Sequence, residues 1–217
     1  MSLAMLEVQF REPLARAFQK VPLGPKEEPG EDRVVVGGVS WEQYLAFDEA
    51  RGADNSRPKL YYLDDELEIM TTSRRHERLA KWLGEMLADY LLESDFEVFT
   101  CGQATLQKLN AGGAEPDDSW CLGEEKEFPD IALEIALTSG GLNKLEIYRR
   151  FPVPEVWFWR KVGLEIWNLN ADATKYDGPS RASRLLPGLD IALLERCLAL
   201  PTWREARRAF QQALKSE

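Results

Sequence analysis

Two acids and one lysine stand in a part of the sequence that is otherwise rich in apolar residues. Asp117 precedes one predicted strand, Glu134 lies inside the next, and Lys144 follows on a short helical segment. Two carboxylates that present oxygens to one point suit Mg²⁺ or Mn²⁺, hard cations that also bind substrate phosphate. A neighbouring ammonium can orient a water or stabilise negative charge that develops on phosphorus. These residue types therefore indicate metal-assisted cleavage of a phosphate ester.

Lys144 departs from the pattern of residues 142–151, a segment that follows a Gly-Gly pair and precedes Pro152. At about 100° per residue, this lysine falls among the apolar side chains of the predicted helix. An ammonium in such a position needs an acidic partner, or its stem packs while the amine reaches solvent. Both arrangements fit the helix taken alone, and the acids on the preceding strands favour the first.

Residues 128–137 are apolar except for Asp130 and Glu134, a pattern typical of a strand that is covered on both faces. Glu134 lies well inside this strand, which places a carboxylate in a core and makes it a functional candidate. Asp130 stands at the start of the strand after Pro129, where a turn-capping acid is ordinary, so we assign it a structural role. Asp117 taken alone is also typical of a turn, but the second acid and the lysine make it part of a more specific set.

A long amphipathic helix is predicted over about residues 75–93, with Thr72 or Ser73 as its N-cap. Glu77 lies at the edge of the apolar arc, in the first turn of this helix. Such an acid can complement the helix dipole alone, or it can join a metal site. His76, the only histidine of the chain, points into the arc. It is expected to be a hydrogen-bonded core residue, and it is an outside candidate for the site.

The segment 129–159 carries a resemblance to a known family. It holds Glu-Ile-Ala at Glu134, Gly-Gly-Leu-Asn-Lys-Leu-Glu-Ile-Tyr around Lys144, and Val-Pro-Glu-Val-Trp-Phe-Trp after it. Together with Asp117, these motifs closely resemble the Uma-type "putative restriction endonuclease" family of the PD-(D/E)xK nuclease superfamily, over about residues 40–200. The superfamily lysine normally lies two residues after the second acid, where this chain has Ala136. The family is known for a lysine moved onto the next helix, which here is Lys144.

The resemblance implies an α/β fold with a restriction-endonuclease-like core, in which helices flank a central mixed β-sheet. It implies hydrolysis of DNA phosphodiester bonds with Mg²⁺ (or Mn²⁺) as the cofactor. Asp117 and Glu134 would hold the metal, and Lys144 would position the attacking water or stabilise the charge on phosphorus. Glu77 matches the acid of the first core helix that often completes the metal site. It would either bind the metal directly or contact the residues that do.

Two other functions stay open. A non-catalytic protein-interaction module would keep the fold, and an acidic surface suits protein partners. A phosphodiesterase that acts on RNA or on small nucleotides is the third alternative, because a metal site alone does not select the polymer. A homodimer is one expected assembly, since cutting both strands of DNA needs two sites.

The 217 residues, 44 % of them hydrophobic, suffice for one sizeable core. We therefore expect a single domain over residues 33–217, after a proline-rich N-terminal extension over residues 1–32. No apolar run is long enough to span a bilayer, and the N-terminus has no signal-peptide pattern. The three cysteines include no C-x-x-C pair, which argues against a zinc site and for a reducing, cytoplasmic location.

The formal net charge of −10 is unusual for a protein that grips DNA, because phosphate neutralisation normally needs a basic surface. In many nucleases a basic cleft and a bound metal ion supply positive charge locally. DNA is therefore expected as a weakly or specifically bound partner, without tight non-specific binding. The candidate basic patches, each of which is also typical of a solvated surface, are Arg74, Arg75, Arg78 and Lys81, then Arg149 and Arg150, then Arg160 and Lys161.

The remaining elements are predicted from periodicity and from turn signals. A hairpin over residues 59–70, with Asp64-Asp65 as its turn and one solvent-facing side, is expected before the core. Residues 96–109 are expected to form one strand that pairs with 119–122, and residues 176–183 a loop. The other expected elements are a strand at 34–36, a helix at 41–50, a strand pair at 155–160 and 164–169, a short helical segment at 185–200 and a terminal helix at 203–215.

Overall fold

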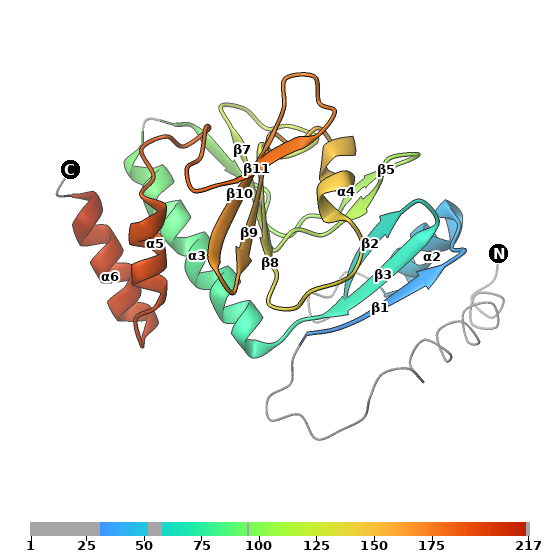
Figure 1. The fold of residues 1–217 in the computed structure, drawn as a ribbon, viewed down its shortest axis with the longest axis horizontal. Helices are drawn as coiled ribbons and strands as arrows, with labels where there is room; N and C mark the ends of the chain where they lie inside the picture. The colour runs from blue at the N-terminus through green and yellow to red at the C-terminus, as the bar shows by residue number, and fades with distance from the viewer. Residues whose placement is uncertain (1–30, 52–57, 95, 216–217) are drawn as a thin grey trace.

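The structure is a computed structural model that describes residues 31–51, 58–94 and 96–215. This part of the chain forms two β-sheets with helices around them (Figure 1). The predicted extension over residues 1–32, with a helical piece near 14–19, lies outside the described residues except for its last two. Within the described ranges, none of the helices is long and apolar enough to cross a membrane.

The larger sheet has six strands in the order β11-β10-β9-β8-β7-β4. In chain order these are β4 (Val98–Thr100), β7 (Asp118–Leu122), β8 (Ile131–Ile135), β9 (Glu155–Arg160), β10 (Gly163–Leu169) and β11 (Tyr176–Ser180). The β8–β9 pair is parallel and every other pair is antiparallel. A parallel pair needs a long crossover connection, and helix α4 (Lys144–Arg150) lies in it. The predicted central mixed sheet is therefore confirmed.

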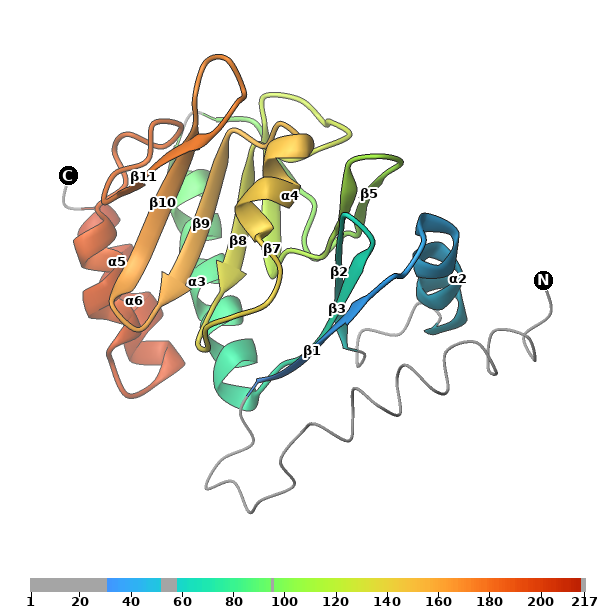
Figure 2. The same cartoon turned by 45° about the vertical axis from the view of Figure 1, so that its right-hand side comes forward.

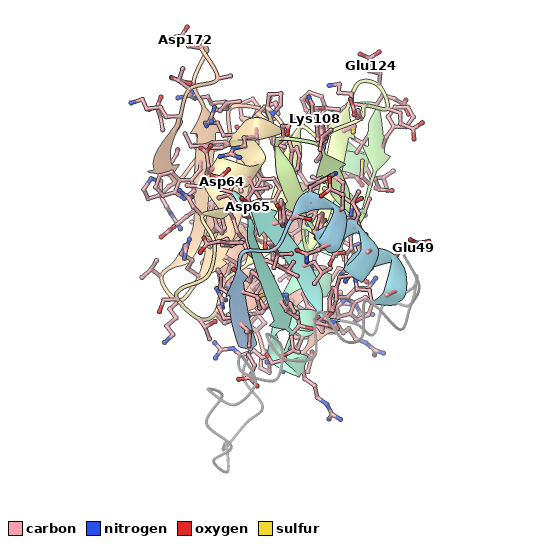
Figure 3. All side chains as sticks on the ribbon, turned by 90° about the vertical axis from the view of Figure 1, so that its right-hand side faces the viewer. Glu49, Asp64, Asp65, Lys108, Glu124 and Asp172 are labelled. Carbon is pink, nitrogen blue, oxygen red and sulfur yellow. The ribbon has the colours of Figure 1, made fainter. Side chains whose placement is uncertain are left out.

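The smaller sheet has five antiparallel strands in the order β1-β3-β2-β6-β5. In chain order these are β1 (Asp32–Gly37), β2 (Lys59–Leu63), β3 (Glu66–Thr71), β5 (Leu106–Lys108) and β6 (Gly112–Ala114). The predicted hairpin is confirmed as β2–β3, and its turn residues Asp64 and Asp65 have φ of 48° and 62°. Two-residue hairpin turns need this left-handed region, which aspartate tolerates. Figure 3 shows both acids at the tip of the hairpin.

Helices cover one face of each sheet. Helices α3 (Arg74–Glu93), α5 (Ile191–Leu198) and α6 (Trp203–Leu214) pack on the same face of the larger sheet and lie behind it in Figure 2. Helix α2 (Trp41–Arg51) packs on the outer face of the smaller sheet. Ser73 caps α3 as predicted, because its side chain accepts the N–H of His76.

A separate core lies between the two sheets, and α4 contributes to it. Because side chains alternate along a strand, Leu133 and Ile135 of β8 face α3, and Glu134 between them faces this interlayer core. The interlayer core thus receives the one charged side chain of β8. Its buried apolar and aromatic members include Tyr61, Leu63, Met70, Ala132, Tyr148, Phe151, Val156 and Phe158.

Two predictions about strands are wrong. Residues 96–109 do not form one strand, because β4 belongs to the larger sheet and β5 to the smaller one. The chain turns between them at Gly102, whose φ is +58°. The expected loop at 176–183 is instead largely strand β11, Tyr176–Ser180. Its Pro179 is tolerated because β11 is an edge strand whose register with β10 shifts between Ile166 and Asn168.

The expectation of a solvent-facing side on the hairpin is also wrong. Glu68 of β3 is fully buried, because it lies opposite Tyr61 of β2 on the side that packs against the larger sheet and α4. Its Oε2 accepts the N–H of Leu142 at 2.6 Å. An acid that alternation assigns to solvent therefore holds the loop that leads to α4.

Close packing between α2 and β6 predicts a penalty for any side chain at Gly113. A Cβ atom at this position would lie 2.8 Å from Cε1 of the buried Tyr44 ring and closer still to its hydroxyl. We expect Gly113→Ala to lower the free energy of unfolding, measured by urea denaturation, by about 1–3 kcal/mol. Gly37→Ala is the matched control, because nothing lies within 4 Å of the added atom. Equal losses in the two variants would contradict this packing.

Candidate active site

The register of two paired strands brings the predicted acids side by side. Asp118 of β7 lies opposite Leu133 of β8, and the N–H of Asp117 donates to the carbonyl of Leu133 at 2.8 Å. Because the strands are antiparallel, Asp117, which precedes Asp118, and Glu134, which follows Leu133, are neighbours. Asp117 Oδ2 also accepts the N–H of Ile135 at 2.6 Å, which ties this carboxylate to β8.

Glu134 is fully buried between the sheets and uses both carboxylate oxygens. Tyr148 of α4 donates its hydroxyl to Oε1 at 2.5 Å, and Tyr61 of β2 shares its hydroxyl proton between Oε2 at 3.0 Å and the main-chain carbonyl of Glu115 at 2.9 Å. Lys144 adds an ion pair from Nζ to Oε2 at 2.8 Å. Burial and the charge of Glu134 raise the pKa of both tyrosines well above the ordinary value. Both phenols therefore stay protonated and donate to Glu134.

Lys144 begins α4 next to its N-cap Asn143, and its side chain turns inward. Only 10 % of the side chain is exposed, and Nζ lies 3.6 Å from the centre of the Tyr61 ring, a cation–π contact. The alternative in which the amine reaches solvent is therefore wrong. The ammonium pairs with Glu134 and also helps to lower the pKa of Asp117. The two predicted acids and the predicted lysine thus meet in one place.

Asp117 is nearly buried and binds two cationic groups through Oδ1. Lys59 of β2 donates from Nζ, and Nε2 of His76 lies 2.8 Å away. Burial by itself raises the pKa of Asp117, but the charges of Lys59 and His76 outweigh it and hold the pKa well below its usual range. Asp117 is therefore ionised at any pH near neutrality.

His76, in the first turn of α3, bridges two carboxylates. Its Nδ1 lies 2.7 Å from Oε1 of Glu31, and its Nε2 lies 2.8 Å from Oδ1 of Asp117. Burial lowers the pKa of His76, but the two carboxylates outweigh it and raise the pKa to about 9. The ring is therefore an imidazolium near neutral pH and donates from both nitrogens. The expected core histidine is confirmed, and the same residue belongs to the site.

Glu77, the third predicted metal ligand, is next in sequence but lies at the surface. It lines an open cavity of about 360 Å³ together with Asp117 and Asp118. Burial raises the pKa of Asp118 to about 6. Glu77 thus borders the site from the α3 side, while His76 makes the direct contact with Asp117. The role of Glu77 as a metal ligand stays a prediction.

Asp130 has the structural role predicted for it. Its Oδ2 accepts the N–H of Leu122 at 2.7 Å, and its carboxylate also pairs with Lys126. These bonds close the loop between β7 and β8 at the end away from Asp117. The pairing of β7 with β8, on which the site depends, is thereby held at both ends.

The predicted basic patches differ in how many of their side chains form ion pairs within the protein. Arg149 and Arg150 both pair with Glu146, and Arg160 pairs with Glu165. The patch at the start of α3 is more open. Its exposed members are Arg74, Arg75, Arg78 and Lys81, of which Arg78 lies over the Trp82 ring and Lys81 pairs with Glu85.

Sequence patterns missed several residues that complete the site. Lys59 and Tyr61 lie on the hairpin, which the sequence presents as an addition before the core. Tyr148 falls in the apolar arc of its helix, where a core role is the ordinary interpretation. Glu31 lies in the segment predicted to be an extension. One signal was available in the sequence, because alternation puts Lys59 and Tyr61 on the same side of the predicted strand.

The donor set fits a hard divalent cation by chemical type. Asp117 and Glu134 offer neighbouring carboxylates, and Mg²⁺ commonly takes one or two carboxylates with waters and substrate phosphate. Within the described ranges, no group of three or more His, Cys, Asp or Glu side chains is arranged to hold a metal ion. The carboxylate oxygens instead accept bonds from protein groups, so a metal ion would compete with ammonium groups for them.

A mixed sheet with acids on two paired strands and a lysine on the following helix defines a restriction-endonuclease-like α/β protein. The chain belongs to the Uma2 family, described as "Putative restriction endonuclease", which matches residues 41–200. None of the curated proteins compared with the chain matches it.

One similar solved structure is the crystal structure of a "putative nuclease belonging to DUF820" from Anabaena variabilis. The two chains are 10 % identical, and the match covers 75 % of this chain and 97 % of that chain with a TM-score of 0.44.

The raised pKa of His76 predicts how stability changes with pH. A raised folded-state pKa stabilises the fold below the unfolded value, near 6.5, and this contribution is lost as the pH rises through about 9. We expect the wild type to lose about 3 kcal/mol relative to His76→Gln between these limits. Urea denaturation across this pH range measures the difference, and the single histidine resonance in NMR reports its pKa directly. A resonance that titrates near 6.5 would contradict the bridge to Glu31 and Asp117.

Proposed function

We propose that the protein is a divalent-metal-dependent DNA endonuclease that hydrolyses phosphodiester bonds. The observation that carries the proposal is the 2.8 Å ion pair between Lys144 Nζ and Glu134 Oε2, next to Asp117. In this arrangement the ammonium of Lys144 lies beside two neighbouring carboxylates between the sheets. The description of the family supports the class of reaction.

The roles follow from the chemistry of each side chain. Asp117 and Glu134 are the residues that would hold Mg²⁺ or Mn²⁺, which when bound stabilises charge on phosphate oxygens and acidifies water. Lys144 presents N–H donors and positive charge beside the carboxylates, where it orients the attacking water or stabilises charge on phosphorus. Tyr61 and Tyr148 hold the Glu134 carboxylate in one orientation. Preorganised groups of this kind need no rearrangement at the moment of reaction.

The site must open for a polymer to reach it. Asp117 borders the open cavity at Glu77, but the side chains of Asp117 and Glu134 are only 1 % and 0 % exposed, so a phosphodiester contacts both only after a covering segment moves. The loop 136–143 precedes Lys144 and is held from β1, because Arg33 donates to Thr138 Oγ1 at 2.9 Å. Movement of this loop is part of the proposal.

DNA is the proposed substrate. Exposed arginines lie at the start of α3, and the same part of this helix carries His76 of the site. Few phosphate contacts are available from such a patch, which suits weak or specific binding by a chain of net charge −10. Exposed acids project from other parts of the surface in Figure 3, among them Glu49, Glu124 and Asp172.

A second candidate function is a non-catalytic interaction module that retains the fold. One observation favours it: both oxygens of Asp117 and both oxygens of Glu134 already accept bonds from protein groups. A network that is satisfied without a metal ion can serve stability alone. Cleavage and metal binding distinguish the two functions.

Cleavage is tested with supercoiled plasmid in Mg²⁺ or Mn²⁺. We expect Glu134→Gln and Lys144→Met each to lower the nicking rate by about 100-fold or more, because each removes charge from the reacting centre. Lys175→Met is the matched control, since this exposed lysine lies between β10 and β11 and belongs to none of the candidate basic patches. Equal nicking in all four proteins would assign the activity to a contaminant. Single-stranded RNA and a cyclic dinucleotide as alternative substrates test the choice of DNA.

Metal binding is tested by isothermal titration calorimetry. We expect the wild type to bind Mg²⁺ or Mn²⁺ with a Kd in the millimolar range or tighter, and Asp117→Asn to lose this binding, because the neutral amide removes the charge that Mg²⁺ needs. Glu77→Gln tests the predicted third ligand, and a weaker affinity in this variant would support it. No detectable heat in the wild type would instead favour the interaction module.

A further inference from the structure

Lys59 is a buried lysine that the proposed roles of Asp117, Glu134 and Lys144 leave without a function. It begins β2 in the smaller sheet, so it reaches the site from the hairpin side. Only 9 % of its side chain is exposed. An ammonium in such a place costs free energy unless all of its donors are satisfied. The groups that Lys59 contacts therefore indicate its role.

Among the residues that the structure describes, Lys59 has three acceptors, and all three are oxygens. Nζ donates to the main-chain carbonyl of Glu115 at 3.2 Å, to that of Pro116 at 3.0 Å, and to Oδ1 of Asp117. A carboxylate and two carbonyls that converge on one point are ligands that a hard cation prefers. The ammonium of Lys59 thus lies where a cation would lie, and it is fixed there by its own chain.

Each carboxylate of the site has its own ammonium from a different side. Lys59 binds Asp117 from β2, and Lys144 binds Glu134 from α4. In two-metal hydrolases, carboxylates hold two ions about 3.5–4 Å apart. Here a lysine already takes the oxygens of one such position and brings one positive charge to it.

We propose that Lys59 is a built-in cation, whose ammonium fills an oxygen-lined cation site at Asp117 and limits the protein to one divalent ion. The identity of that one ion rests on the proposed function, whereas the filled site at Asp117 does not. Lys59 acts through Asp117 and is a positioning residue. It holds Oδ1 on the side of the hairpin and leaves a second metal ion no room there.

A lysine that only joined β2 to residues 115–117 would make the same contacts. The two roles differ when the charge is removed and the stem is kept. A purely structural lysine leaves a less stable protein with unchanged metal binding. If Lys59 instead fills a cation site, removal of its charge leaves that site vacant, and the site then accepts a divalent ion.

The experiment counts bound Mn²⁺ per chain from the loss of the free-ion electron paramagnetic resonance signal. We expect Lys59→Met to bind one more ion per chain than the wild type. Lys59→Arg, which keeps the charge, and the surface control Lys175→Met should bind the wild-type number. Adding Asp117→Asn to Lys59→Met should remove the additional ion, because Asp117 supplies the only carboxylate among the three oxygens, and under the proposed function it should remove the wild-type ion as well.

Each outcome separates this inference from the proposed nuclease function. A folded Lys59→Met protein with the wild-type number of ions overturns the inference, and Lys59→Gln is measured in the same way if the methionine variant does not fold. A wild type that binds two ions overturns it without any variant. A wild type that binds no ion, with Lys59→Met binding one, upholds the filled site and overturns the metal-dependent nuclease. A wild type that nicks DNA, without an additional ion in either variant, overturns the Lys59 inference alone.

Discussion

The structure depends on the compensation of negative charge that is buried between two sheets. Asp117 and Glu134 bring carboxylates into a layer where water does not solvate them. Each is satisfied by an ammonium and by further donors, so that neither is left with an unpaired charge. Removing one partner from a buried ion pair commonly costs about 3–5 kcal/mol. This constraint explains why charged or hydroxyl-bearing side chains enter the layer from β2, α3 and α4 alike.

The smaller sheet is part of the site. Tyr61 crosses from β2 to Glu134, and Lys59 crosses from the same strand to Asp117. Arg33 of β1 and Glu68 of β3 hold the loop that leads to Lys144. The larger sheet therefore supplies the acids, and the smaller sheet supplies much of what orients and neutralises them. A family core of one mixed sheet with an added hairpin describes the topology but understates the role of the hairpin.

The first described residue, Glu31, joins three parts of the molecule. Its Oε1 binds the imidazole of His76 on α3, and its Oε2 accepts the hydroxyl of Thr138 at 2.8 Å in the loop before α4. The other nitrogen of the imidazolium binds Asp117. A segment that composition assigns to an N-terminal extension thus ends in the charge network, and hydrogen bonds join it to the loop at Thr138.

The sequence by itself was sufficient to identify the charged residues that interrupt an apolar pattern. Glu134 and Lys144 interrupt apolar runs, and burial of such residues requires partners wherever the elements pack. The hairpin, the capped α3 helix and the strand pair β9–β10 were also predictable, because turn residues, caps and periodicity are local signals. Only the tertiary structure decided which strand faces meet. Lys59 and Asp117 are 58 residues apart and Tyr61 and Glu134 are 73 apart, and no local pattern records that β2 packs against the larger sheet. The same packing buries Glu68 and splits residues 96–109 between two sheets, because the environment of a strand face is set by the layer that covers it.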